Sequence, residues 1–313
     1  MRINSHRTPA ILSRRATLLA GLGFFGCGRE GTHQRVDPAL GPLIPSDTTT
    51  LVGIRLDHLR KTPAWKQLFP DNAPSVLDGL AKKSGIDVKE TVHEVLYCLG
   101  GRHRCGLIRG KFVDEGPNNS GMEPQLKMEG AQKFPYKGFT LIGKEEFAAT
   151  FFNSSVVALG NAAAIRAIID NNERKNAVPQ ALLNMVQALP VAANVYAVST
   201  SPSIPEGGVG GVRSLPLTLK SAWAYADLTT TASIRAEGEG TTAEDAKKLV
   251  DAFKALTSLL RMTLKPAQKQ MLTVLDSLQV VQDNAKVKLQ ADLPLETVLD
   301  LLKGIDLSDK LRA

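Results

Sequence analysis

Short turns join the most clearly patterned strands of this chain, and this feature restricts its fold more than any other. In "VLYCLGGRHRCGLI" (residues 95–108), two apolar runs flank a Gly-Gly-Arg-His turn over residues 100–103. A turn of this length is typical of a β-hairpin, in which the two strands run antiparallel. With this loop, Cys98 lies directly opposite Cys105, and Leu99 lies opposite Arg104.

A second hairpin and one further strand continue this pattern toward the C-terminus. "SAWAYADL" (residues 221–228) and "ASIRAEGEG" (residues 232–240) are joined through Thr229–Thr231. Strict alternation in "AKVKLQAD" (residues 285–292) predicts a strand with one face in the core and one in water. The residues predicted to point inward are Ala285, Val287, Leu289 and Ala291, and those predicted to point outward are Lys286, Lys288, Gln290 and Asp292.

Helices are predicted between these hairpins and not after every strand. Thr241-x-x-Glu244 is a capping box, which predicts the start of a long helix. The residues that follow at helical spacing form an apolar stripe: Ala246, Leu249, Val250, Phe253, Leu256 and Leu260. Further helices are predicted over Thr62–Leu68, Pro74–Lys83, Ala162–Asn172, Ala181–Leu189 and Pro266–Leu278.

This order of elements predicts an α+β fold with mostly antiparallel sheets and paired helices. It also indicates two similar halves, residues 48–190 and residues 191–313, although no repeat of individual residues supports a duplication.

The N-terminus predicts export. A leader with four arginines and no acid precedes an uncharged run over Ala16–Gly26, which together are typical of a secretory signal peptide over residues 1–27. As a helix, that run spans roughly 16 Å, about half of a ~30 Å hydrocarbon core, which is too short for a stable anchor. Arg14 and Arg15 lie in "SRRATLL", which resembles a twin-arginine signal; the route for unfolded chains stays open as the alternative.

Cys27 ends this run in "FFGC", which resembles the lipobox of bacterial lipoproteins. The resemblance implies cleavage before Cys27 and acylation of this residue, whereas ordinary cleavage nearby is the alternative. Two or three acyl chains hold a protein on a bilayer, because each buried methylene contributes ~0.8 kcal/mol. Gly28 after the cysteine favours the outer membrane in the proteins that this signal resembles. Residues 28–47, polar and rich in Gly and Pro, are predicted to form a flexible tether.

Charge and composition exclude one class of partner. The formal net charge is +7, and loss of the four leader arginines (Arg2, Arg7, Arg14 and Arg15) lowers it to +3 in the mature chain. With aromatic residues at 5% and no clustered basic segment, the chain lacks the features of a nucleic-acid-binding protein.

Cys98 and Cys105 are the two cysteines left for other roles. In an oxidising compartment their opposed positions predict a structural disulfide. Two buried reduced thiols, a redox pair, and a metal site with His103 are the alternatives. The Cys-x6-Cys spacing differs from the Cys-x-x-Cys of redox proteins, and one histidine is too few for a zinc fingerprint.

Other catalytic motifs are missing from the sequence. It contains no His-Glu-x-x-His and no Gly-x-Ser-x-Gly. Residues 208–213 lack the ending of a phosphate-binding loop, and Arg213 replaces the third glycine of a dinucleotide fingerprint. Residues 201–220 are interpreted as a flexible loop that could also dock a partner. His93 and Glu94 are predicted to be an exposed pair at a strand edge. The sequence therefore predicts no cofactor and no metal site.

Three segments resemble a group of uncharacterised exported bacterial proteins. They are "RGKF" (residues 109–112), "YKGFTLIG" (residues 136–143) and "SSVVALGNAAAIRAIID" (residues 154–170), in this order. The resemblance extends over about residues 45–300 and implies an exported α+β protein, without implying an activity.

The preferred interpretation is a lipid-anchored, periplasm-facing module that binds a ligand or serves as a structural part, without catalysis. An exported enzyme or thiol-redox protein using Cys98, Cys105 or His93 is one alternative. A carrier of a hydrophobic ligand is the other. The predicted partner is the membrane, reached through the lipid anchor.

Overall fold

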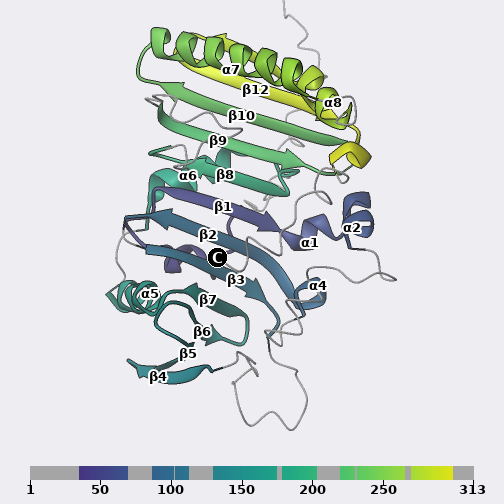
Figure 1. Cartoon of the computed structure of the whole chain (residues 1–313). Helices are drawn as coiled ribbons and strands as arrows, with labels where there is room; N and C mark the ends of the chain where they lie inside the picture. The colour runs from purple at the N-terminus through teal and green to yellow at the C-terminus, as the bar shows by residue number, and fades with distance from the viewer. Residues whose placement is uncertain are drawn as a thin grey trace, which may run out of the picture. The chain divides into compact units, whose positions relative to one another are not determined.

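In the part of the chain that the structure describes, twelve strands pair edge to edge in one sheet (Figure 1). Their order across the sheet is β11-β12-β10-β9-β8-β1-β2-β3-β7-β6-β5-β4. The strands are β1 (Thr50–Arg55), β2 (Val92–Gly100), β3 (His103–Gly110), β4 (Gln132–Tyr136), β5 (Phe139–Gly143), β6 (Ala148–Asn153), β7 (Val156–Gly160), β8 (Val195–Ser199), β9 (Leu219–Asp227), β10 (Ala232–Gly240), β11 (Gln279–Asp283) and β12 (Lys286–Leu293).

The structure is a computed structural model, and it describes residues 35–69, 87–101, 103–112, 130–174, 178–202, 219–229, 231–264 and 269–298. Several predicted features lie outside these residues: the signal peptide with Arg14, Arg15 and Cys27, the tether over residues 28–34, the helix over Pro74–Lys83, and most of the loop over residues 201–220.

Every strand pair in this sheet is antiparallel, as the hairpin patterns predict. The hairpin of β2 and β3 has the predicted register, with Cys98 opposite Cys105 and Leu99 opposite Arg104. Its turn is shorter than predicted, because Gly100 pairs with His103 and leaves two residues between them. Gly101 there has φ +51°, a conformation that two-residue hairpin turns require.

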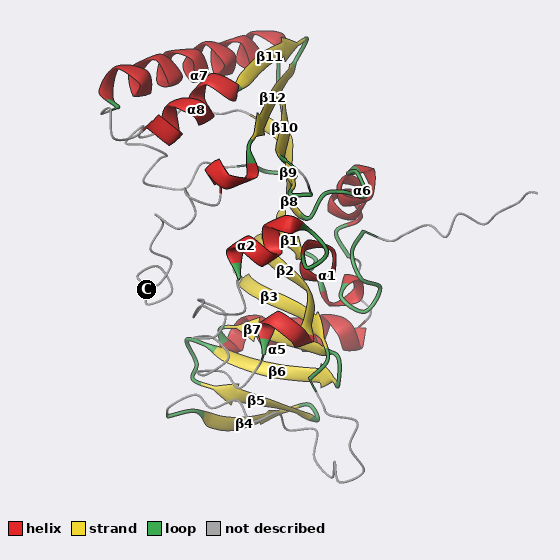
Figure 2. Cartoon of the chain, turned by 90° about the vertical axis from the view of Figure 1, so that its right-hand side faces the viewer, coloured by secondary structure: helices red, strands yellow, loops and turns green. Residues whose placement is uncertain are grey.

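Different helices cover the two faces of the sheet. The described α-helices are α1 (Leu56–Leu59), α2 (Pro63–Leu68), α4 (Val88–Thr91), α5 (Ala162–Arg174), α6 (Gln180–Ala188), α7 (Ala243–Thr263) and α8 (Lys269–Ser277). α5 and α6 lie on one face, and α7 and α8 lie on the other (Figure 2). Leu96 and Val198 of the first face pack in one core with Leu182 of α6, whereas Val287 of the second packs against Leu249 of α7.

The folded body begins before residue 48, where the tether was predicted to end. Residues 35–47 include a short 3-10 helix, η1 (Gly41–Leu43), and four of their apolar side chains are buried in the core: Val36, Leu40, Leu43 and Ile44. The Gly and Pro residues that suggested a tether here instead form tight turns. The spacing of the four apolar residues between them is the signal that the prediction overlooked.

The capping box of α7 lies one residue later than predicted. Thr242 Oγ1 accepts a hydrogen bond from the Asp245 amide at 3.1 Å, and the Thr242 amide donates to Asp245 Oδ2 at 3.2 Å. The usual capping box has glutamate or glutamine at this position, but here aspartate reaches the capping amide.

Three strands, β4, β6 and β11, are absent from the prediction. Pro135 in β4 weakens its strand pattern, and the sheet tolerates it because β4 is an edge strand that needs hydrogen bonds on one side only. β11 is a five-residue strand whose two apolar residues, Val280 and Val281, are adjacent, so it shows no alternation.

Candidate functional site

Small side chains form part of the sheet face that α7 covers. In register across β8, β9 and β10, Ala197 lies beside Ala224, which lies beside Ala236. The next row on the same face contains Ala222 and Gly238. We call these five residues the small-residue floor. Because side chains alternate along a strand, the large Trp223 and Tyr225 point to the opposite face. Only small side chains therefore project from this part of the face that α7 covers.

Helix α7 does not fill the space above the small-residue floor. Leu249 packs closely with Val287, whereas Phe253, one turn later, is only half-buried. A pocket of about 240 Å³ remains between the helix and the sheet. We call it the α7 pocket; in addition to the floor it is lined by Leu219, Leu249, Phe253, Val287 and Leu289, among others.

The α7 pocket is apolar except at one end. Thr50 of β1 and Ser199 of β8 lie opposite each other there, with their hydroxyl oxygens 2.7 Å apart. Glu237 of β10 also borders the pocket, but its side chain belongs to the opposite face of the sheet. There Lys286 Nζ lies 2.8 Å from Glu237 Oε1. The pocket therefore suits an apolar group and offers hydroxyls at one place only.

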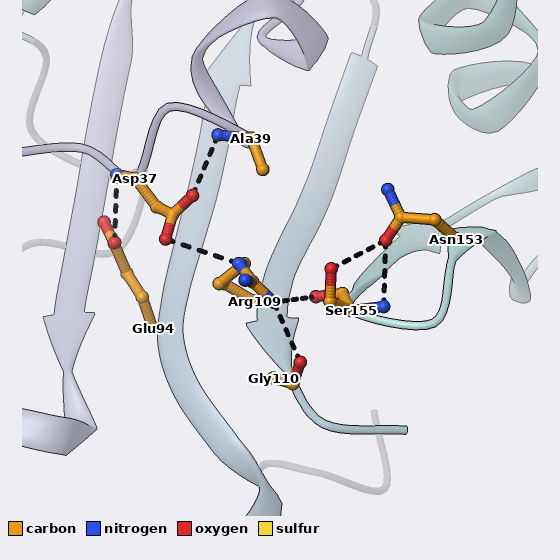
Figure 3. A network of polar contacts seen from close by, with 7 residues as sticks. All are labelled: Asp37, Ala39, Glu94, Arg109, Gly110, Asn153 and Ser155. Carbon is orange, nitrogen blue, oxygen red and sulfur yellow. Dashed lines mark hydrogen bonds and ion pairs between the residues drawn. The ribbon is translucent and has the colours of Figure 1, made fainter. Parts of the chain in front are cut away.

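A second site is a set of polar groups around the buried Glu94 on the α5/α6 face, shown in Figure 3. Glu94 Oε2 accepts a hydrogen bond from the Asp37 amide at 3.1 Å, and Asp37 Oδ2 lies 3.3 Å from Arg109 Nε. Arg109 also donates to the carbonyl oxygens of Gly110 and Ser155 at 2.9 and 3.1 Å. We call Glu94, Asp37 and Arg109 the Glu94 cluster; it fastens the start of the folded body to β2 and β3.

Glu94 is 7% exposed, so the prediction that it belongs to an exposed pair with His93 is wrong. β2 lies in the interior of the sheet rather than at its edge, which the short apolar segment around residue 94 did not indicate. Burial raises the pKa of Glu94 to about 7, although the hydrogen bond from Asp37 opposes this shift. Burial, followed by the charge of Glu94, raises the pKa of the nearby Tyr196 hydroxyl.

This pKa predicts a pH-dependent stability. An unfolded glutamate ionises near its usual value of 4.5, whereas Glu94 in the folded chain keeps its proton until about pH 7. The folded state therefore binds more protons between these values, and its free energy of unfolding falls as the pH rises through this window. Across this window the free energy of unfolding falls by about 3 kcal/mol because of Glu94, and above the window this loss stays constant. Urea unfolding of the wild type and of Glu94→Gln from pH 4 to pH 8 measures it.

As the pH rises, Glu94→Gln should become more stable relative to the wild type, because glutamine carries no charge that burial penalises. Equal slopes for both proteins would contradict the assignment. Glu90→Gln is the matched control, since Glu90 is exposed on α4 and its change should leave the slope as it is.

The structure brings Cys98 and Cys105 together on the buried face, but both are free thiols there. Opposed Cβ atoms in a sheet lie ~4.5 to 5.5 Å apart, and a disulfide needs ~3.5 to 4.5 Å, which explains how such a pair can lie face to face without a bond. A hydrogen bond with Cys105 and burial raise the pKa of the Cys98 thiol. Such a thiol is a poor nucleophile, which argues against the redox alternative. The bridge in the exported protein stays a prediction.

One further histidine, His58, has a charged neighbour in the structure. His58 on α1 lies 2.6 Å from Arg55 Nη2, and burial followed by the charge of Arg55 lowers the pKa of His58. Within the described ranges, no three His, Cys, Asp or Glu side chains are grouped so that they could hold a metal ion. Among the helices described, none combines the length and apolar character needed to cross a bilayer.

The α7 pocket is the site that the sequence prediction did not identify. A signal for it is present in "SAWAYADL", where alanines alternate with Trp223, Tyr225 and Asp227. A strand face made only of alanine, opposite the apolar stripe of a long helix, indicates either very close packing or a cavity. The sequence alone does not separate the two, because the outcome depends on the height of the helix above the sheet.

Comparison with known proteins adds information on the fold. No family model matches the chain, and no curated protein matches it. Among solved structures, crystal form III of TP0453, a spirochaete protein, aligns at a TM-score of 0.53 and 8% sequence identity, covering 86% of this chain and 99% of that one. Crystal form I of the same protein aligns at a TM-score of 0.46 and 7% identity, covering 84% of this chain and 96% of that one. The likeness to form III is a likeness of fold alone.

Proposed function

We propose that this chain is an exported protein, anchored by lipid at Cys27, that binds an apolar ligand in the α7 pocket and catalyses no reaction. The observation that carries the proposal is the pocket of about 240 Å³ above the small-residue floor. It combines the preferred interpretation of the sequence, a binding module, with the alternative of a hydrophobic carrier.

The chemistry of the α7 pocket supports an apolar occupant. An enclosed engineered cavity of about 150 Å³ lined by Leu, Ile and Phe side chains stays dry and takes up benzene, so an apolar lining favours a hydrocarbon over water. Ligand pockets run from about 300 Å³ upward, so this one suits a single chain or ring rather than a molecule with two acyl chains.

Three adjacent strands contribute alanine or glycine at the same level of the floor. A single small residue could be a packing accident, but a floor built in register from three strands gives the pocket a continuous base. The floor lies against the part of α7 where burial of the helix decreases, from Leu249 to Phe253. The ligand would complete the packing between the helix and the sheet.

The other candidate sites favour binding over catalysis. In the Glu94 cluster, the carboxyl group of Glu94 accepts a hydrogen bond from the Asp37 amide and is buried beneath the residues around Asp37. The raised pKa of Cys98 keeps its thiol protonated. An exported enzyme or thiol-redox protein therefore remains the weaker alternative.

The location belongs to the same proposal. A leader with Arg14 and Arg15 followed by a lipobox at Cys27 supports a periplasm-facing protein on the cell envelope, with the outer membrane favoured because Gly28 follows the cysteine. The acyl chains would place the α7 pocket near a bilayer, which is a source of apolar molecules.

Filling the α7 pocket tests the proposal. Ala224→Phe places a ring on the floor, so it should weaken binding of the apolar fluorophore N-phenylnaphthylamine at least about ten-fold while the chain stays folded. Ala255→Phe is the matched control, because Ala255 is exposed on α7 and does not line the pocket. Fluorescence titration measures binding, and circular dichroism checks the fold. Equal binding by the wild type and Ala224→Phe would refute the proposed site.

We also propose that the chain consists of two similar halves that meet near residue 190. The strand order supports it: β1 continues into β2 and β3 on one side, and β8 into β9 and β10 on the other. β1 and β8 pair antiparallel at the junction, which is the relation that a local two-fold axis would produce.

A further inference from the structure

The direction of the hydrogen bond within the hydroxyl pair at the end of the α7 pocket is assigned from the other contacts of Ser199. Ser199 Oγ lies 3.2 Å from the carbonyl oxygen of Thr49, to which it donates, and it accepts from the Ser201 amide at 3.2 Å. Since a hydroxyl has a single hydrogen, Ser199 then accepts from Thr50 Oγ1 across the 2.7 Å separation. The hydrogen of Thr50 is thereby used, and its oxygen is left with acceptor capacity.

Thr50 Oγ1 can therefore accept a hydrogen bond from a ligand but cannot donate one. A hydroxyl group meets this requirement because it brings its own hydrogen. An ether or an ionised carboxylate does not, because it has only acceptor atoms to offer.

The charged side chain among the described lining residues of the α7 pocket points away from it. Glu237, the charged residue that borders the pocket, is paired with Lys286 on the opposite face of the sheet. On that same face Arg235 Nη2 lies 2.9 Å from Asp292 Oδ2. A charged head group in the pocket would lose its hydration without meeting a counter-charge among the described lining residues, and burial of an unpaired charge is strongly unfavourable.

We propose that the ligand of the α7 pocket is a single-chain amphiphile with an uncharged hydroxyl head. Its chain lies over the small-residue floor, beneath Leu249 and Phe253, and its hydroxyl donates to Thr50 Oγ1. This assignment rests on the proposed function, because it names the ligand class for the same pocket.

Displacement of N-phenylnaphthylamine from the full chain by matched probes tests the assignment. Dodecanol, dodecyl methyl ether and dodecanoate share the same chain and differ in the head. We expect dodecanol to bind about three- to ten-fold more tightly than the ether, the range for one net hydrogen bond between neutral groups. We expect dodecanoate at pH 8 to bind more than about ten-fold more weakly than dodecanol, because its charge is unpaired.

Variants of Thr50 assign the difference to one atom. Thr50→Val keeps the shape and removes the acceptor, so it should abolish the preference for dodecanol over the ether while leaving the affinity for the ether unchanged. Thr50→Ser keeps the hydroxyl and should keep the preference. These ratios compare two ligands on one folded protein, so a change in stability does not imitate them.

The outcomes separate this inference from the proposed function. Binding of dodecanoate as tight as that of dodecanol, or a preference that survives in Thr50→Val, would overturn the hydroxyl head and leave an apolar pocket. Failure of all three probes to displace the fluorophore would overturn the pocket as well.

Discussion

Replacing Cys27 by serine is expected to leave the mature protein without acyl chains and to release it from the membrane fraction. In the lipoproteins that this signal resembles, the lipid is attached through a thioether, which needs the sulfur atom. Each buried methylene contributes ~0.8 kcal/mol to membrane binding, so loss of two or three chains removes the whole anchor. Intact mass measures the modification, and fractionation measures the location.

For the wild type we expect loss of the first 26 residues together with the added mass of two or three acyl chains. Cys105→Ala is the matched control, since it removes a cysteine that lies in the folded body and should leave the anchor intact. A wild-type protein that keeps Met1, or a Cys27→Ser variant that stays in the membrane fraction, would contradict the predicted anchor.

Gly53→Ala is expected to cause a large loss of stability. Gly53 lies on β1 opposite Tyr196 of β8, and a Cβ atom at Gly53 would lie 2.1 Å from ring atom Cζ of Tyr196. The ring is buried, so it cannot move aside freely. Overpacking of a core costs about 1 to 3 kcal/mol, and this clash belongs at the upper end or above it.

The free energy of unfolding in urea measures this loss. Gly106→Ala is the matched control on β3, because the nearest atom to its added Cβ would be 3.9 Å away, an ordinary contact. The double variant Gly53→Ala with Tyr196→Leu should recover part of the loss, because the ring is then absent. Equal stabilities of Gly53→Ala and Gly106→Ala would show that the Tyr196 ring does not restrict this position.

The sequence contains most of the information for the local structure of the sheet. The turn after Gly100 and the alternation over residues 285–292 predict hairpin register and strand faces, because both depend on neighbours in the chain. Val287 is buried and Lys286 and Lys288 are exposed, in agreement with that pattern. The antiparallel α+β class follows from such segments.

The position of a strand within the sheet is not contained in local patterns. Glu94 shows the consequence: its charge indicates an exposed residue, whereas β2 lies inside the sheet and the segment around Asp37 covers its carboxylate. The pairing of β1 with β8 joins residues about 145 apart in the chain, and no short-range pattern specifies such a contact.

The α7 pocket could not be predicted for a similar reason. The alternating alanines of β9 show its floor, but the height of the pocket depends on how Leu249 of α7 rests on Val287 of β12. The hydroxyl pair of Thr50 and Ser199 joins two distant strands and becomes apparent only when they are side by side.

Native mass spectrometry of the full chain purified from the membrane fraction tests the central claim most directly. We predict that the wild type carries a small uncharged molecule in addition to its covalent acyl chains, and that Ala224→Phe, isolated in the same way, carries the acyl chains alone. A wild type without a bound molecule, or the same bound molecule in both proteins, would contradict the assignment of the α7 pocket as the binding site.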